Sequence, residues 1–212
     1  MYNSVMTSLS SPPDPHDERR RDVVQAAASL LAEHGPAALT LRRVASEVGG
    51  STQLVYTLFG GKPGLADALY AEGFARLAGR TEQALAAAPP VGDPDRIVAC
   101  GRAYCDFARD DTAFFSLMFG RSVPGFAPRA ETRRAGRAAT LGLLTRTVAE
   151  CVGAGTLESD DVTAVAHVCW ATAHGVAGLL VAGLLREDDA ALTEMLRVPV
   201  RAHRPGGATC PS

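Results

Sequence analysis

Apolar residues along this chain recur at intervals of three and four, the spacing that places side chains on one face of an α-helix. Val23, Ala27, Leu30 and Leu31 follow this spacing, and the Gly35-Pro36 pair ends the segment. Runs in which Val, Ile, Tyr and Thr alternate with polar residues are almost absent, whereas Ala, Leu, Arg and Glu are abundant. The pattern predicts an all-α protein whose first helix is capped by Asp14 or Asp17 and runs to about His34.

Two short amphipathic segments follow this helix. Thr40 can cap the first, LRRVASEV, in which the apolar residues share one face and the charged residues point away. The Gly49-Gly50 pair breaks it, and Ser51 or Thr52 can cap the second, TQLVYTLF. Two short helices joined by a glycine turn are the parts of a helix-turn-helix, expected here over residues 40–59. An ordinary αα-hairpin is the alternative that this pattern leaves open.

The rest of the chain is predicted to contain six further helices. They are expected at about residues 62–88, 95–109, 110–120, 129–153, 161–185 and 190–198, and RSVPGFAP should form an irregular connection. PPVGDP interrupts the pattern after residue 88 and marks a domain boundary. We therefore expect a disordered tail at 1–16, a helix-turn-helix domain at 17–62, a connecting helix at 63–88, a second helical domain at 89–200 and a flexible tail at 201–212.

The expected helix at 161–185 is apolar all round, which requires that more than one of its sides be covered. One stripe contains Trp170 and His174, and another contains Cys169 and Val176. The helix is also rich in glycine and alanine, which permit a close approach of neighbouring helices. We predict a two-fold homodimer whose four-helix interface is built from this helix and the one before it.

A membrane-spanning helix is the competing interpretation of the same segment. No charge occurs from Val162 to Leu185, and the length exceeds the roughly 20 residues that a bilayer requires. Histidines, threonines and glycines weaken its hydropathy, neither flank is strongly basic, and no aromatic belt is present. The first sixteen residues also lack the basic and apolar regions of a secretory signal. The expectation is a cytoplasmic protein with no membrane partner.

Composition fits a folded protein, but the overall charge does not by itself indicate nucleic acid. The 212 residues are 47% hydrophobic and 21% charged, with a net charge of -2. Local neutralisation of phosphates matters more than total charge, so a few clustered cations suffice. The candidates are Arg19, Arg20, Arg21, Arg42, Arg43 and Lys62. A solvated helix face is the competing interpretation of the arginine run at 19–21.

The second short helix carries residues suited to reading DNA. Such a helix must be slim and polar on its outer face to enter a major groove about 12 Å wide. The outward side chains that can contact bases and phosphates are Ser51, Thr52, Gln53, Tyr56 and Thr57. Thr40 with the first amides of its helix, and Lys62, are suited to holding phosphates. Double-stranded DNA is therefore the expected partner.

These motifs carry a family resemblance. The stretch TLRRVASEVGGSTQLVYTLFGGKPGLADALY, with the preceding LLAEHGPAALT, resembles the DNA-binding domain of TetR-type transcriptional regulators over roughly residues 18–75. The family's characteristic residues match Ala45, Gly49, Ser51, Tyr56, Phe59 and Lys62. The resemblance implies phosphate contacts from Thr40, Tyr56 and Lys62, and base contacts from Thr52 and Gln53.

Two positions depart from the family pattern. Gly50 stands in the turn where an apolar residue is usual, and this loosens the turn by roughly 0.5 kcal/mol. Leu58 stands where the recognition helix commonly carries His, so a phosphate contact from that position does not carry over. Neither change removes a group that the fold requires.

The resemblance also implies a role for residues 89–200, because in TetR-like proteins the second domain dimerises and senses a small molecule. CWATAHGVAGLLVAGLL resembles a C-terminal variant of the family marked by Trp, His and Gly, here Trp170, His174 and Gly175. A cavity for a small apolar or amphipathic ligand is expected. Its candidate lining is Tyr104, Phe107, Phe114, Phe115, Met118, Phe119, Trp170 and His174. Plain core packing is the alternative for these aromatics.

No metal site, cofactor or catalytic set is predicted. His167 and His174 lie seven residues apart without a third ligand at fixed spacing, so satisfied core histidines are favoured. Five cysteines without CxxC pairs fit reduced, buried thiols, with oxidant sensing as the alternative. A Gly-rich phosphate loop, paired catalytic carboxylates or a Ser/His/Asp set cannot be picked out. The chain is expected not to be an enzyme, with a small α-helical enzyme as the rival hypothesis.

The resulting hypothesis is a ligand-responsive repressor. A dimer places two recognition helices in successive major grooves about 34 to 36 Å apart, which requires a pseudo-palindromic operator. A bound ligand would favour a conformer in which that spacing no longer fits the DNA. The signal would pass through the helix that starts near Lys62.

Overall fold

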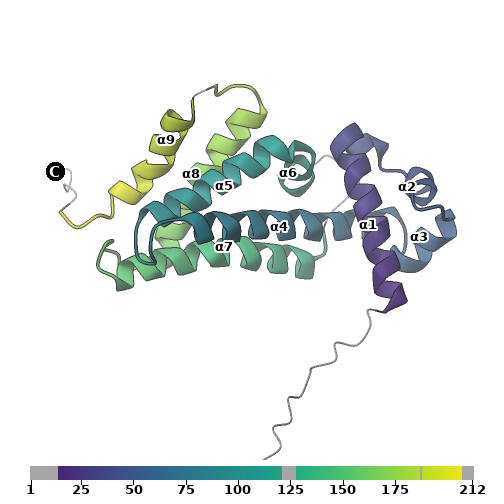
Figure 1. Cartoon of the computed structure of the whole chain (residues 1–212), viewed down its shortest axis with the longest axis horizontal. Coiled ribbons are helices and arrows are strands. Elements are labelled where there is room, and N and C mark those ends of the chain that lie inside the picture. Colours follow the sequence, from purple (N-terminus) through teal and green to yellow (C-terminus); the bar gives the residue numbers. More distant parts are fainter. Residues whose placement is uncertain (1–13, 121–127, 187, 207–212) are drawn as a thin grey trace, which may run out of the picture.

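The computed structural model describes residues 14–120, 128–186 and 188–206, and every regular element in these ranges is helical. A small unit of three helices lies at one end, and a larger helical unit lies at the other (Figure 1). The buried apolar residues of both units form one continuous cluster. The predicted all-α class is therefore confirmed.

The small unit consists of α1 (Pro15–His34), α2 (Leu41–Glu47) and α3 (Thr52–Phe59), with a 3-10 turn at Pro36–Ala38. The Asp14 carboxylate caps α1 by accepting from the His16 N–H at 2.9 Å, and Gly35 ends the helix with φ 71°. The Thr40 hydroxyl caps α2 by accepting from the Arg43 N–H at 3.3 Å. The sequence signals for these helix ends thus correspond to hydrogen bonds.

The turn between α2 and α3 depends on two adjacent glycines with different roles. Gly49 adopts φ 60°, a left-handed conformation that side chains disfavour. Gly50 donates its N–H to the Ala45 carbonyl at 2.8 Å, and a Cβ placed on it would lie 2.8 Å from Leu54 Cδ2. At Gly50, where the family pattern has an apolar residue, the space beside the turn is therefore occupied by the Leu54 side chain.

One long helix, α4 (Lys62–Ala87), joins the two units. It packs against α1 and α3 near its start and against α5, α6 and α7 along the rest of its length (Figure 1). Gly73 lies at its crossing with α6 (Thr112–Phe119), where a Cβ would lie 2.6 Å from Met118 Sδ and 3.0 Å from Phe114. The missing side chain at this glycine lets the two helices approach closely.

The larger unit is completed by α5 (Asp95–Asp110), α7 (Ala130–Gly153), α8 (Val162–Val181) and α9 (Asp189–Arg201). Helix α5 is central, with α4, α8 and α9 packed around it. Phe107, Val148 and Leu192 are fully buried among these helices. Their burial explains why the second unit needs no strand to form a core.

Several predicted helix ends are wrong by a few residues. Helix α8 stops at Val181 rather than at 185, because Gly183 is left-handed (φ 69°) and the Leu184 N–H turns back to the Leu179 carbonyl at 2.9 Å. Helix α9 begins one residue earlier than expected and runs three residues further, with Asp188 as its N-cap accepting from the Ala191 N–H at 2.8 Å.

The expected tails and the expected RSVPGFAP connection fall largely outside the described residues. Residues 1–13, 121–127 and 207–212 are not described, whereas α1 already begins at Pro15. At the other end, the described residues 202–206 follow α9 and pack on the protein, since the Glu158 N–H donates to the His203 carbonyl at 2.7 Å.

A buried carboxylate fixes α7 against α4. Asp67 is 3% exposed and accepts hydrogen bonds from the Arg129 N–H at 3.0 Å, from Arg129 Nε at 2.6 Å and from the Thr132 hydroxyl at 3.0 Å. Burial alone would raise the pKa of this carboxyl, but the hydrogen bonds from Arg129 and Thr132 outweigh it and hold the pKa below its usual value.

We predict that Asp67→Ala lowers the free energy of unfolding by about 2 to 3 kcal/mol, because charge-assisted bonds are lost and donors are left unpaired. Urea denaturation at neutral pH measures this loss. A depressed pKa in the folded state stabilises the protein above the unfolded value of 3.8, so the difference from the native protein should shrink as pH falls below that value.

The exposed Asp110 is the matched control for this variant. It pairs with Arg80 at 2.6 Å near the surface, and Asp110→Ala should cost less than about 1 kcal/mol. An equal loss in the two variants would contradict the assigned role of Asp67.

Candidate DNA interface and ligand cavity

The outer face of α3 is polar and exposed, and its inner face is buried. Val55 and Leu58 pack inward, with 0% and 8% of their surfaces exposed. The predicted DNA-contacting residues of this helix are all exposed: Ser51, Thr52, Gln53, Tyr56 and Thr57. Burial of Leu58 agrees with the expectation that no phosphate contact arises from that position.

Local contacts fix two of these outward residues. The Thr57 hydroxyl donates to the Gln53 carbonyl at 2.9 Å, so it remains available as an acceptor. Tyr56 is 53% exposed, and one edge of its ring lies over Gly61, where a Cβ would be 3.1 Å from Tyr56 Cε1. The missing side chain at Gly61 therefore leaves room for the tyrosine ring beside the start of α4.

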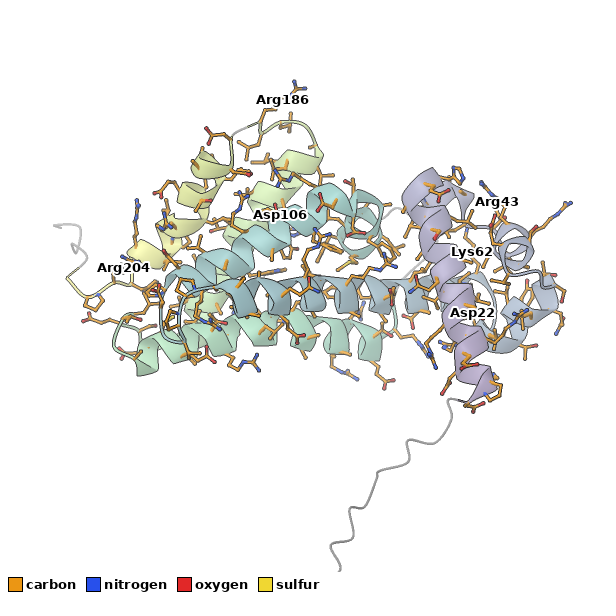
Figure 2. All side chains as sticks on the ribbon, viewed as in Figure 1. Asp22, Arg43, Lys62, Asp106, Arg186 and Arg204 are labelled. Carbon is orange, nitrogen blue, oxygen red and sulfur yellow. The ribbon has the colours of Figure 1, made fainter. Side chains whose placement is uncertain are left out.

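Four further candidate residues surround α3. Arg42 and Arg43 are exposed on α2, and Lys62 is exposed at the first residue of α4. Figure 2 shows Arg43 on the small unit and Lys62 where α4 leaves it. Thr40 is exposed too, but its hydroxyl already accepts from the Arg43 N–H. All the predicted DNA-contacting residues thus lie on the small unit.

Two arginines of α1 serve the domain itself. Arg19 donates to the Val48 carbonyl at 3.2 Å, at the end of α2. Arg20 donates to the Leu58 carbonyl at 2.5 Å, at the end of α3, and its guanidinium lies 4.3 Å above the Phe59 ring. Cations at the carbonyl ends of helices are stabilising, so this pair holds both short helices in place. The run at 19–21 is therefore not simply a solvated face.

The second unit contains a cavity of about 560 Å³ between α4, α6, α7 and α8. Its volume lies in the range of small-molecule sites. The lining residues are Tyr70, Phe74, Phe119, Ala130, Arg133, Arg134, Arg137, Thr140, Leu141 and Trp170. A much smaller cavity of about 30 Å³ adjoins it and shares Thr140, Leu141 and Trp170 with it.

The predicted cavity residues divide into three groups. Phe119 and Trp170 line the large cavity, and Tyr104 lines the small one. His174 lines neither cavity but contacts residues that do. Its Nδ1 lies 2.8 Å from the Tyr104 hydroxyl, and the centre of its ring lies within 6.0 Å of the centres of four aromatic rings. The remaining candidates are buried and line neither cavity: Phe107, Phe114, Phe115 and Met118.

The Tyr104–His174 pair is uncharged near neutral pH. Burial lowers the pKa of the His174 imidazole and raises that of the Tyr104 phenol. A neutral imidazole can accept a hydrogen bond from the phenol at Nδ1, so the pair is a satisfied polar contact beside the cavity. Burial likewise raises the pKa of the Cys100, Cys105 and Cys169 thiols to about 11, which keeps them protonated and unreactive.

Sequence reasoning missed the three arginines of the cavity wall. Arg133 and Arg137 are four residues apart, and Leu141 follows four residues later, so one face of α7 presents them together. The spacing of these residues can be read from the sequence. The cavity that they face cannot, because its other walls are formed by α4, α6 and α8. Within the described residues no group of three His, Cys, Asp or Glu side chains is placed to hold a metal.

Solved structures share this architecture. A Rhodococcus sp. RHA1 protein with unknown function is 30% identical, with a TM-score of 0.76 over 94% of this chain and 100% of that one. A TetR family protein from Vibrio parahaemolyticus is 18% identical, with a TM-score of 0.62 over 88% of this chain and 99% of that one. The fold and the outer face of α3 together define a helix-turn-helix protein with a helical C-terminal domain.

Family models cover both units. The model for bacterial regulatory proteins of the tetR family matches residues 23–69, and that for the tetracyclin repressor-like C-terminal domain matches residues 97–202. The chain belongs to the TetR family of bacterial regulatory proteins, which are DNA-binding transcriptional regulators. The resemblance of the N-terminal stretch to TetR-type regulators is thereby confirmed.

Curated relatives match a shorter stretch. The HTH-type transcriptional regulator Rv1816 of Mycobacterium tuberculosis (strain ATCC 25618 / H37Rv) is 26% identical over 113 residues. That stretch is 53% of this chain and 48% of the relative, and the Mycobacterium bovis regulator Mb1846 matches to the same extent. The chain therefore spans about half the length of the curated relatives it matches.

We predict that Arg20→Ala lowers the free energy of unfolding by about 1.5 to 3 kcal/mol, because a charge-assisted hydrogen bond and a cation–π contact are lost together. Chemical denaturation followed by circular dichroism measures the change. The exposed neighbour Arg21 is the matched control, and Arg21→Ala should stay within about 0.5 kcal/mol of the native protein. Equal stability of the two variants would argue against this role for Arg20.

Proposed function

We propose that this protein is a homodimeric transcriptional repressor that binds a pseudo-palindromic DNA operator and leaves it when a small molecule occupies the cavity of the second unit. The observation that carries the DNA-binding part is α3, whose polar outer face is exposed while its inner face is locked by a buried core. A slim helix supported in this way can enter a major groove.

The proposed contacts follow from exposure and charge. Thr40, Tyr56 and Lys62, with Arg42, Arg43, Ser51 and Thr57 around them, contact phosphates. Thr52 and Gln53, in the first turn of α3, contact base edges, where a glutamine amide can bond adenine with both of its groups. We assign residues 17–62 to this DNA-binding domain, 63–88 to the connecting helix and 89–200 to the domain for dimerisation and ligand binding.

The proposal of a dimer rests on an exposed seam on α8. Only 33% of the apolar stretch of this helix is buried inside the protein. Large apolar side chains therefore remain exposed, among them Val168 with 52% and Leu179 with 45% of its surface accessible. The seam consists of Ala164, Val168, Ala171, Gly175, Leu179 and Ala182, all exposed and spaced by three or four residues. This spacing and these small residues suit close packing against a second helix.

Helix α7 presents a similar exposed face beside α8. A shallow groove of about 590 Å³ runs along it and is lined by Ala138, Leu141, Gly142, Thr145 and Ala149 together with three cations, Arg134, Arg137 and Arg146. Two such helices from each copy would form the four-helix interface expected from the sequence. Both faces contain small residues, which permit the close approach of a helix from a second copy.

A membrane span is the competing role for α8. By length and composition this helix is apolar enough to cross a bilayer. Its remaining side is packed against α5 and α7, and membership in a family of DNA-binding regulators favours burial in a dimer. We therefore propose that the protein works in the cytoplasm, and that it is a regulator rather than an enzyme, as is general in this family.

The route from ligand to DNA runs along α4. Tyr70 and Phe74 of this helix form part of the cavity wall, and its first residue, Lys62, adjoins α3. A ligand that fits only one orientation of α4 shifts the population toward it. The spacing of the two α3 helices in the dimer then changes, and the operator is released.

A mobility-shift assay with the DNA upstream of the gene tests DNA binding. The native protein should bind with an affinity that falls steeply with salt. Tyr56→Ala and Lys62→Ala should weaken binding to all sequences, and Lys62→Ala should reduce the salt slope by about 1. Gln53→Ala should change sequence preference at one base pair by about 1 to 3 kcal/mol.

The matched control is Gln83→Ala, on the exposed side of α4 in the second unit, which should bind DNA like the native protein. If Tyr56→Ala, Lys62→Ala and Gln53→Ala all retain native affinity and preference, the DNA-binding helix has been wrongly assigned.

Light scattering tests the dimer. The native protein should have about twice the 22.1 kDa mass of one chain at micromolar concentration. Val168→Asp places a charge in the centre of the proposed seam and should yield the single-chain mass. Val198→Asp, at an equally exposed valine on α9, should leave the dimer intact. A native mass of 22.1 kDa at that concentration refutes the dimer.

A further inference from the structure

One wall of the large cavity carries an excess of positive charge. Arg133, Arg134 and Arg137 line it from α7, and no acidic residue is among its lining residues. Each guanidinium provides five hydrogen-bond donors in a planar arrangement that matches carboxylate and phosphate groups. The electrostatic character of the cavity is therefore cationic on this side.

These arginines differ from most other arginines of the second unit. Within the described residues, ion pairs with Asp or Glu are formed by Arg76, Arg80, Arg102, Arg109, Arg129, Arg146, Arg197, Arg201 and Arg204. In those same ranges the three cavity arginines have no such pair, and Arg137 Nη2 contacts His167 Nε2 at 3.0 Å instead. All three are exposed, and their guanidinium groups are available to an anionic ligand.

The opposite walls of the cavity are aromatic. Tyr70 and Phe74 come from α4, Phe119 from α6 and Trp170 from α8. The Phe74 ring lies 4.9 Å from that of Tyr70 and 5.7 Å from that of Phe119, so these side chains form a continuous apolar surface. A cavity with one cationic wall and an aromatic remainder is matched by a molecule with an anionic end and an apolar body.

We propose that the ligand of this cavity is an amphipathic anion, with a carboxylate or phosphate head held by Arg133 and Arg137 and an apolar body packed on Phe74, Phe119 and Trp170. The inference rests on the proposed function, because it names the chemical class of the ligand that the regulator senses. A neutral apolar molecule of equal length leaves the arginines without a partner and binds less tightly. A cationic one is repelled.

Trp170 provides a direct readout, because it is the single tryptophan of the chain and lines the cavity. Its fluorescence is titrated with laurate, dodecyl phosphate, dodecanol and dodecyltrimethylammonium, each below the concentration at which it aggregates. Laurate and dodecyl phosphate should change the emission and bind at least about tenfold more tightly than dodecanol. A preference for one of the two anions identifies the head group, carboxylate or phosphate.

Variants of the cationic wall assign the preference to its residues. The double variant Arg133→Ala with Arg137→Ala should lose about tenfold in laurate affinity while dodecanol affinity is unchanged. Arg133→Lys, which keeps the charge, should retain most of the affinity. Arg186→Ala removes one positive charge beyond the end of α8 (Figure 2) and should bind laurate like the native protein. Light scattering on each variant verifies that the oligomeric state has not changed.

The outcomes separate this inference from the proposed function. Equal affinities for laurate and dodecanol, an unchanged affinity in the double variant, or no binding of either anion would overturn the anion inference, whatever the DNA result. Mobility shifts with and without laurate then test the regulator independently. Arginine-dependent laurate binding that leaves DNA affinity unchanged supports the ligand class and refutes release by ligand.

Discussion

Helix α4 is the constraint on which the other parts of the protein depend, because it belongs to both units at once. Its 26 residues extend over about 39 Å, from the start beside α3 to the far end of the second unit. Between these ends, buried Asp67 binds Arg129 and Thr132 and so fixes the start of α7. A change at the cavity reaches the start of α4 along a single helix, and only Gly60 and Gly61 separate that helix from α3.

The cations of the small unit divide into two sets with different roles. Arg19 and Arg20 are turned inward and bind the carbonyl ends of α2 and α3, whereas Arg42, Arg43 and Lys62 remain exposed. This division reconciles a net charge of -2 with a DNA-binding fold. The inward pair positions the reading helix, and the outward set is available to phosphates, whose binding depends on local charge.

Local features of the fold could be predicted from the sequence, and features set by packing could not. The helix cap at Thr40 and the turn at Gly49 follow from the chemistry of these two residues. The ends of the helices in the small unit can therefore be predicted to within a residue or two. The end of α8 was missed, because apolar residues continue past the left-handed Gly183. Aromatic density likewise could not distinguish Phe107, which is core, from Phe119, which faces the cavity.

Helix α7 connects the proposed dimer interface with the proposed ligand site, since Arg134, Arg137 and Leu141 line both the cavity and the groove that contains Ala138 and Gly142. In the proposed dimer, an anion that draws the arginines toward it would act on the same helix that packs against the second copy. Because packed interfaces between small residues tolerate little displacement, a shift of α7 favours a different pairing of the two copies rather than a gradual deformation. Ligand binding and the geometry of the dimer are then coupled by a rigid helix, and the spacing of the two α3 helices follows from both.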